Sequence, residues 1–237
     1  MAGSAPSDVP GYEHDPDRDR RWRSIVERFC VLATRNEADG VVPRLLGAGV
    51  RRVLEVGSNR GPVAERLAAR GVFTVCVELD ADVVRLAHRP AVRATAARLP
   101  VADASVDAVS ALNVLYFLPR PEEAVAEARR ALRPSGLFVA CTQRRDNDPE
   151  LRDVAPGWGK PSSFDGDNAE AVVRHVFDDV EVEPWDVTAY RFPDRAAVAE
   201  YLAVFYKLPA EEARRRAATL PSPLALTKRG LYVWARS

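Results

Sequence analysis

The sequence predicts an α/β protein with a doubly wound, mostly parallel sheet and helices on both faces. Two observations support this prediction. Short, continuous apolar runs, typical of parallel strands buried on both faces, alternate with segments of helical spacing. The run Val53–Val56 is followed by a turn with a glycine at each end, Gly57 and Gly61, and by a helix that starts at Pro62. Because ligands of such folds bind at the carboxyl ends of the strands, this turn is the expected centre of a ligand site.

The pattern predicts seven strands and eight helices in order along the chain. The strands are expected at residues 52–56, 72–77, 91–94, 107–112, 136–142, 180–190 and 224–235. The helices are expected at residues 17–36, 41–46, 62–71, 81–87, 121–132, 168–176, 194–205 and 210–218. Asp80 is the expected N-cap of the fourth helix. The fifth carries Glu122 and Glu123 in its first turn and Arg129 and Arg130 near its end, which complements the helix dipole.

Length and composition indicate one domain. The chain has 237 residues, of which 47% are hydrophobic, enough for one core. Residues 1–11 are rich in Ala, Gly, Ser and Pro and are expected to be disordered, so that the domain covers residues 12–237.

The charge balance argues against nucleic acid as a partner. The 34 Lys and Arg residues equal the 34 Asp and Glu residues, so the chain lacks the basic excess that neutralises phosphates. Two arginine clusters keep an RNA-binding alternative open: Arg18, Arg20, Arg21 and Arg23, and Arg214–Arg216. Solvated helix faces explain both more simply.

Cysteine usage and hydropathy indicate a reduced, cytoplasmic protein without a membrane partner. Cys30, Cys76 and Cys141 are odd in number and widely spaced, which predicts neither a disulfide framework nor a metal site. The N-terminus has no apolar signal segment, and no apolar run is long enough to span a membrane.

The turn does not fit a dinucleotide. The Rossmann fingerprint requires three glycines as G-x-G-x-x-G, whereas this turn is Gly57-x-Asn59-x-Gly61. A pyrophosphate would also lie close to the carboxylate of Glu55, two residues before the turn.

S-adenosylmethionine fits better, because it carries an ammonium group and a carboxylate at one end and adenosine at the other. Glu55 can attract the ammonium group, while the amides of residues 57–61 receive the carboxylate. Glu78, at the end of the second predicted strand, is placed to accept both ribose hydroxyls, and Leu79 to cover one face of the adenine. The interval from Gly57 to Glu78 matches the roughly 20 residues between a glycine turn and a ribose-binding acid.

With these residues the chain resembles a class I S-adenosylmethionine-dependent methyltransferase, in the branch whose first motif is V-L-D/E-x-G-x-G-x-G. The resemblance runs from about Arg52 to Thr142, through Leu99–Asp103, Asn113–Pro119 and Ala131–Gly136. It implies a Rossmann-like fold with seven strands, the last of them antiparallel, and methyl transfer from the cofactor. It also implies a helical cap at residues 12–48 and insertions near the acceptor site at residues 143–167 and 191–222.

Three positions depart from the family pattern. Asn59 replaces the central glycine of the first motif, and Asn tolerates a left-handed backbone better than most residues. Thr95 stands where the family usually has an Asp that reads the adenine amino group, so its hydroxyl or the backbone of Ala96 must take that role. Tyr116-Phe117 stands where the family often has Glu-His.

The expected site residues form two sets. The expected cofactor-binding residues are Glu55, Gly57, Ser58, Asn59, Gly61, Glu78, Leu79, Thr95, Ala96 and Asn113. No catalytic base is identified; Tyr12, His14 and Tyr116 are candidates, the first two because the N-terminal segment of such enzymes often folds over the cofactor. Five aromatic residues are candidates for an acceptor pocket or for packing: Trp158, Trp185, Tyr190, Tyr201 and Tyr206. No metal is expected.

The leading hypothesis is therefore methyl transfer from S-adenosylmethionine, with S-adenosylhomocysteine as product, to a small-molecule acceptor such as one of secondary metabolism. The alternatives are an RNA methyltransferase and a cofactor-binding homologue without catalysis. Because a sulfonium methyl is reactive by itself, the enzyme chiefly positions the nucleophile. The sequence consequently leaves the acceptor, the methylated atom and the oligomeric state open.

Overall fold

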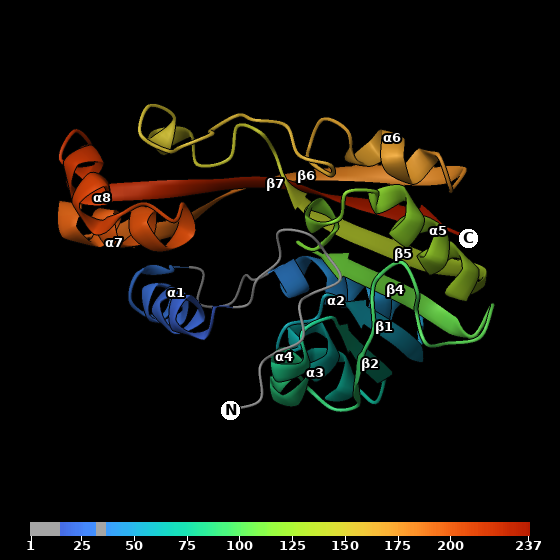
Figure 1. Ribbon diagram of the computed structural model, residues 1–237. Coiled ribbons are helices and arrows are strands. Elements are labelled where there is room, and N and C mark those ends of the chain that lie inside the picture. Colours follow the sequence, from blue (N-terminus) through green and yellow to red (C-terminus); the bar gives the residue numbers. More distant parts are fainter. Residues whose placement is uncertain (1–14, 32–36) are drawn as a thin grey trace.

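A seven-stranded sheet forms the centre of the molecule, with the strand order β3-β2-β1-β4-β5-β7-β6 (Figure 1). The computed structural model describes residues 15–31 and 37–237. The strands are β1 (Arg52–Val56), β2 (Phe73–Glu78), β3 (Ala91–Arg93), β4 (Val106–Leu112), β5 (Leu132–Gln143), β6 (Asp179–Phe192) and β7 (Leu224–Arg236). The helices are α1 (Pro16–Phe29), α2 (Glu37–Gly47), α3 (Pro62–Ala68), α4 (Ala81–Leu86), α5 (Pro121–Ala131), α6 (Ala169–Arg174), α7 (Arg195–Phe205) and α8 (Ala210–Ala217).

The sheet confirms the predicted topology. Strands β1 to β5 pair in parallel, and β7 runs antiparallel to both of its neighbours, β5 and β6. Six strands therefore share one direction, and the last strand of the chain opposes them. Two single-turn 3-10 helices, at Leu115–Phe117 and Pro149–Leu151, lie in the connections after β4 and β5.

Helices cover both faces of the sheet. One apolar core packs α5 and α6 against alternate residues of the central strands, such as Val109 and Phe138. A second core packs α2 and α3 against the opposite face, through residues such as Val139 and Trp234. The alternation of 138 and 139 between the two cores is the period of two expected of a strand buried on both sides.

Side-chain caps and prolines fix where the helices begin. Asp80 accepts hydrogen bonds from the amides of Asp82 and Val83, which confirms its predicted role as the N-cap of α4. Asp15 caps α1 in the same way. Pro62 occupies the first turn of α3, where its missing N–H has no cost.

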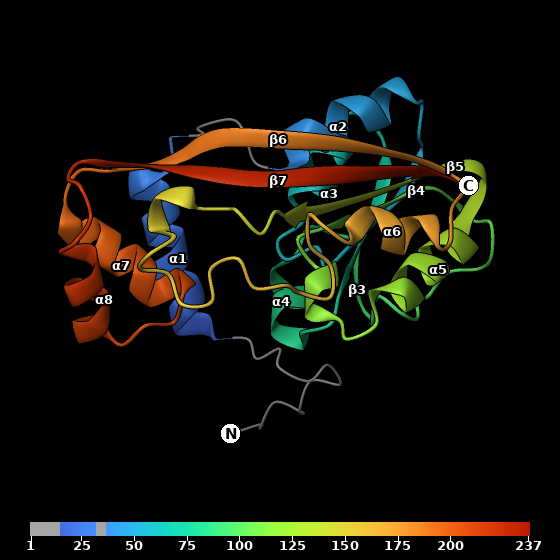
Figure 2. The ribbon, with the colours of Figure 1, turned by 90° about the horizontal axis from the view of Figure 1, so that it is seen from above.

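The hairpin β6–β7 is longer than the rest of the sheet and carries a second lobe. Strand β5 pairs with β7 only as far as Gly230, whereas β6 and β7 remain paired to Phe192 and Leu224 (Figure 2). Around this extension α1, α7, α8 and residues 151–158 build a separate apolar core. We call this group the second lobe.

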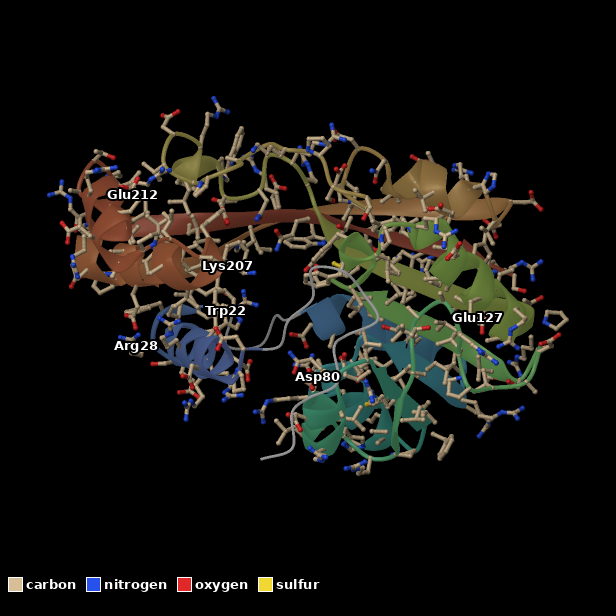
Figure 3. All side chains as sticks on the ribbon, viewed as in Figure 1. Trp22, Arg28, Asp80, Glu127, Lys207 and Glu212 are labelled. Carbon is tan, nitrogen blue, oxygen red and sulfur yellow. The ribbon has the colours of Figure 1, made fainter. Side chains whose placement is uncertain are left out.

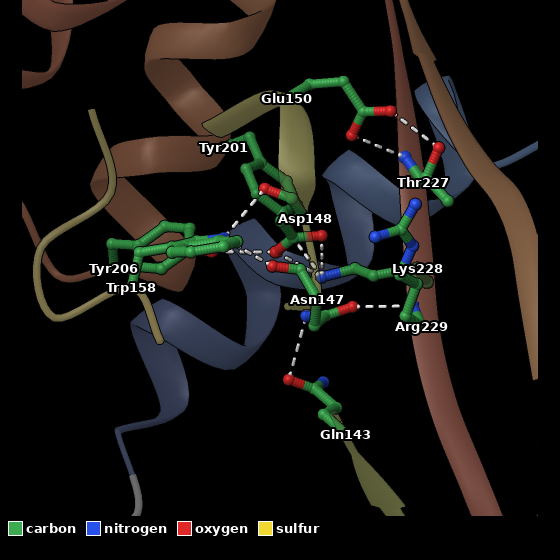
Figure 4. A network of polar contacts seen from close by, with 10 residues as sticks. All are labelled: Gln143, Asn147, Asp148, Glu150, Trp158, Tyr201, Tyr206, Thr227, Lys228 and Arg229. Atoms are coloured by element: carbon green, nitrogen blue, oxygen red, sulfur yellow. Dashed lines mark hydrogen bonds and ion pairs between the residues drawn. The ribbon is translucent and has the colours of Figure 1, made fainter. Parts of the chain in front are cut away.

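A buried polar network holds the second lobe to the main sheet (Figure 4). Asp148 is fully buried and accepts hydrogen bonds from Lys228 Nζ at 2.8 Å, Tyr206 Oη at 2.8 Å and Tyr201 Oη at 3.2 Å. The indole N–H of Trp158 donates to the backbone carbonyl of Asn147 at 2.8 Å. The network therefore joins the segment after β5 to α7 and β7.

The first helix is shorter than predicted. A helix over residues 17–36 was expected, but α1 ends at Phe29. Cys30 and Val31 instead adopt an extended backbone along the edge strand β6. Cys30 forms a bridge with Tyr190, and the amide of Val31 donates to the carbonyl of Ala189 at 3.0 Å.

Residues 1–11, predicted to be disordered, and residues 32–36 lie outside the described residues. Within the described part no helix is both long and apolar enough to cross a membrane.

Candidate functional site

The turn after β1 lies at the carboxyl end of the sheet, between β2 and β4. Its backbone is left-handed at Gly57 (φ 63°), Asn59 (φ 49°) and Gly61 (φ 81°). Asn59 thus adopts the conformation that was expected to be feasible for it. Here the chain connections on the two sides of β1 diverge, which is where ligands bind in this class of fold.

The two glycines of the turn permit close packing inside the protein. A Cβ atom on Gly57 would lie 2.3 Å from Cγ2 of Val114. One on Gly61 would lie 2.7 Å from the sulfur of Cys76 and 2.9 Å from Cβ of His88. Gly61 thus accommodates its protein neighbours and lines neither of the two pockets beside the turn. A direct contact of Gly61 with the cofactor stays a prediction.

Glu55 is directed at the first turn of α3. Its carboxylate accepts hydrogen bonds from the amides of Ala64 at 2.7 Å and Val63 at 3.2 Å, and the residue is only 4% exposed. Burial raises the pKa of Glu55 to about 7, despite the opposing effect of these two hydrogen bonds. The structure therefore gives Glu55 a structural task that sequence reasoning did not foresee. Its attraction of an ammonium group stays a prediction.

Glu78 connects the end of β2 to the turn. One carboxylate oxygen accepts the amide of Asn59 at 3.0 Å, and the other accepts that of Leu79 at 2.8 Å. Each oxygen retains a second lone pair, so the carboxylate can still accept from a ligand hydroxyl. Glu78 also fixes the left-handed residue Asn59 in position.

Two pockets meet at Val56 and Gly57. The larger is a cleft of about 430 Å³ that lies between the turn and α1. The smaller, of about 50 Å³, lies on the side of β2. Among the predicted cofactor-binding residues, the cleft brings together Glu55, Gly57, Ser58, Asn59 and Asn113, and the smaller pocket brings together Gly57, Glu78, Leu79, Thr95 and Ala96.

The smaller pocket has apolar walls that sequence reasoning missed. Val114, Phe117 and Leu118 line it beside Glu78, and Phe117 as a residue is 45% exposed. An exposed aromatic ring at a pocket is unusual enough to suggest a ligand surface. The signal was present in the sequence, because Tyr116-Phe117 stood out as a departure from the family pattern.

The candidates for catalysis are not brought together. Tyr116 packs against the main core and lines neither pocket, whereas Asn113 lines the cleft with a left-handed backbone (φ 54°). Tyr12 and His14 lie outside the described residues. Among the described residues no three His, Cys, Asp or Glu side chains gather where they could hold a metal ion.

One face of α1 forms the far wall of the cleft. The lining residues of this face are Asp19, Trp22, Arg23, Val26 and Glu27. Their spacing places them on one face of the helix; the sequence pattern had predicted the helix but not its position beside the site. Five aromatic residues were candidates for an acceptor pocket or for packing; they line neither pocket and pack in the interior: Trp158, Trp185, Tyr190, Tyr201 and Tyr206.

The arginine clusters are largely neutralised by neighbouring acids. On α8, Arg214 pairs with Glu211, and Arg215 and Arg216 both pair with Glu212. On α1, Arg23 lines the cleft but pairs with Asp19 at 2.5 Å. Neither cluster offers a row of uncompensated charge beside the cleft, which weakens the RNA alternative.

Comparison with known proteins gives the same fold and domain. Residues 54–140 match the methyltransferase domain family. An uncharacterised methyltransferase of Mycobacterium bovis is 36% identical over 107 residues, which are 43% of this chain and 44% of that protein. A malonyl-[acyl-carrier protein] O-methyltransferase of Enterobacter lignolyticus is 29% identical over 123 residues, 50% of this chain and 49% of that protein. The matches thus span about half the length of these curated relatives.

Solved structures extend the likeness over most of the chain. The [4+2]-cyclase SpnF superposes with a TM-score of 0.61 at 16% identity and covers 92% of each chain. An S-adenosylmethionine-dependent methyltransferase of Archaeoglobus fulgidus superposes with a TM-score of 0.52 at 18% identity and covers 85% of this chain and 95% of that one. At these identities the likeness shows the fold alone.

Proposed function

We propose that this chain, which carries a methyltransferase domain of the Rossmann-like class I fold, binds S-adenosylmethionine and transfers its methyl group to a small-molecule acceptor. The observation that carries the proposal is the pair of pockets joined at Val56 and Gly57, one lined by Glu78 and the other by Ser58 and Asn59 of the turn. This division suits a ligand with a nucleoside at one end and an amino acid at the other.

The residues present fit this cofactor. Glu78 has free lone pairs for the ribose hydroxyls, and Leu79 and Phe117 supply apolar surface for the adenine. Thr95 and Ala96 border the same pocket and take the role of the usual Asp.

The amino-acid end belongs in the cleft. There Ser58, Asn59 and Asn113 border the space beside the turn, and the carboxylate of Glu55, ionised above its pKa of about 7, lines the same cleft. No basic cradle for a pyrophosphate is formed by these residues, which agrees with a cofactor that has no phosphate.

The chemistry asks little of the protein beyond placement. When bound, the cofactor would supply a methyl group on a sulfonium centre that can leave as a neutral thioether, and a proton released by the acceptor would pass to solvent. The turn and Glu78 hold one reactant, and the α1 wall confines the other. This role needs no assigned catalytic base unless the acceptor must lose a proton before it reacts.

Two measurements test the proposal. Calorimetric titration with S-adenosylhomocysteine is expected to show one site per chain, and absence of binding would overturn the proposal. Incubation with methyl-labelled S-adenosylmethionine and a bacterial extract, separated into small-molecule and RNA fractions, is then expected to label the small-molecule fraction. Label confined to RNA would favour the RNA alternative, and binding without any labelling would favour a fold used for other chemistry.

A further inference from the structure

The α1 wall of the cleft presents an aromatic side chain and acidic side chains of its own, distinct from the residues of the turn. It faces the side of the cleft opposite Gly57 and Asn59, and α1 belongs to the second lobe rather than to the main sheet. If the cofactor lies along the turn, the acceptor must lie against α1. The selection of an acceptor by this wall therefore rests on the proposed function, which places the cofactor there.

Trp22 supplies the flat surface of the wall. Among the described residues it is the only aromatic side chain that lines the cleft. Its ring centroid lies 5.4 Å from that of Phe205, 5.9 Å from that of Tyr201 and 6.0 Å from that of Tyr190. Figure 3 shows Trp22 on the side of α1 toward α7. An indole held by three rings offers a rigid surface for a planar ligand, and its face attracts a cation.

The charges of the cleft leave an acidic excess on the α1 wall. Asp19 and Arg23 form an ion pair at 2.5 Å and cancel one another. Glu27, one helical turn beyond Arg23, is exposed and has no ion-pair partner among the described residues. On the opposite wall Arg60 and Glu65 contribute one charge of each sign, and Glu55, whose pKa burial raises to about 7, adds a second, partly ionised carboxylate. The uncompensated carboxylate of Glu27 therefore sets the preference of the wall.

We propose that the acceptor is a planar aromatic compound with a positively charged amine, its ring against Trp22 and its ammonium group toward Glu27. Val26 and Leu112 add apolar surface to the lining of the same cleft. An anionic aromatic compound would meet Glu27 without a compensating cation, and an aliphatic amine would leave the Trp22 face unused. Selectivity thus requires both features in one molecule.

The test uses four probes on the protein loaded with S-adenosylhomocysteine: tryptamine, tryptophol, indoleacetate and hexylamine. Tryptamine carries both features, tryptophol and indoleacetate keep the ring without the cation, and hexylamine keeps the cation without the ring. We expect calorimetry to give a dissociation constant for tryptamine about tenfold or more below those of the other three. Equal binding of indoleacetate, or no preference for tryptamine, overturns the proposal.

Variants assign the preference to the two residues. Glu27→Gln is expected to remove the advantage of tryptamine over tryptophol. Asp17→Asn is the matched control, because it removes an acid from the same helix outside the cleft. Trp22→Leu should weaken the binding of tryptamine and of tryptophol to a similar extent, and Trp22→Phe should retain part of that binding. Retained selectivity in Glu27→Gln overturns the proposal.

The titration with S-adenosylhomocysteine separates the two levels of inference. If every variant binds S-adenosylhomocysteine as the unsubstituted protein does, a failure with the four probes concerns the acceptor alone. If the unsubstituted protein does not bind S-adenosylhomocysteine, the proposed function fails, and the acceptor proposal fails with it. Because Trp22 packs against α7, loss of S-adenosylhomocysteine binding in Trp22→Leu but not in Trp22→Phe would show a role in folding and overturn the assignment to the acceptor.

Discussion

Lys228 and Asp148 form an ion pair where the second lobe joins the main sheet, with Nζ 2.8 Å from the carboxylate and 4.2 Å from the centroid of the Phe205 ring. Lys228 is 8% exposed and Asp148 is fully buried. Two buried charges are tolerated because each has a partner. Removal of one leaves the other buried and unpaired, which is costly.

Asp148→Asn is therefore expected to lower the free energy of unfolding by about 3–5 kcal/mol, as for other broken buried pairs. Urea denaturation measures it. Asp146→Asn is the matched control, because Asp146 is 35% exposed at the side chain and pairs with Arg144 and Arg229 near the surface. Equal stability of the two variants would contradict the argument.

Glu78→Ala is expected to weaken the binding of S-adenosylhomocysteine at least about tenfold, because hydrogen bonds to the ribose are lost. Calorimetry measures it, with Glu123→Gln on α5 as a control outside both pockets. Unchanged affinity in Glu78→Ala would mean that the cofactor binds elsewhere.

Gly57→Ala should be far more damaging than Gly49→Ala. Both positions have a left-handed backbone, φ 63° and φ 69°, so both substitutions cost about 1–2 kcal/mol of backbone strain. Only the Cβ at position 57 meets a neighbour, Val114, since nothing lies within 4 Å of a Cβ at position 49. Thermal unfolding of the two variants distinguishes the backbone strain common to both from the steric clash with Val114 at position 57. Similar melting temperatures would show that Val114 moves aside freely.

Glu55 predicts a pH dependence of stability. Its pKa in the folded state, about 7, is above the ordinary value of 4.5, so the folded protein holds this proton more tightly than the unfolded chain. The resulting stabilisation is complete below pH 4.5 and is lost as the pH rises through about 7, by about 3 kcal/mol in all. Glu55→Gln should remove this part of the slope between pH 5 and 7.5 in urea denaturation. An identical slope in the variant would show that Glu55 ionises normally.

The sequence predicted the sheet well, because each strand carries its own local signal. Strand β1 was predicted at its observed bounds, and Asp80 was recognised as a cap, since apolar runs and capping residues act over a few positions. The end of α1 was missed, because it depends on the pairing of Cys30 with Tyr190, 160 positions away in the sequence.

The candidate site was predictable only in part. Residues adjacent to strand ends, such as Glu78 and Thr95, lie beside a pocket, because parallel strands end at one edge; their contact with the cofactor stays a prediction. The direction of the Glu55 carboxylate and the presence of Trp22 in the cleft were not, because both result from side-chain packing between segments that no local pattern relates. The same limit applies to the buried pair of Lys228 and Asp148.

Because the second lobe is built around the long β6–β7 hairpin, the parts proposed to bind the methyl donor and the acceptor are distributed differently along the chain. The proposed donor half is one continuous stretch within residues 54–140, whereas the second lobe is assembled from α1, residues 151–158 and the segment from α7 to the start of β7. A chimera that keeps the donor half of this protein could not acquire a new acceptor wall by grafting one segment. All three segments would have to be transferred together, with the buried residues through which they contact one another.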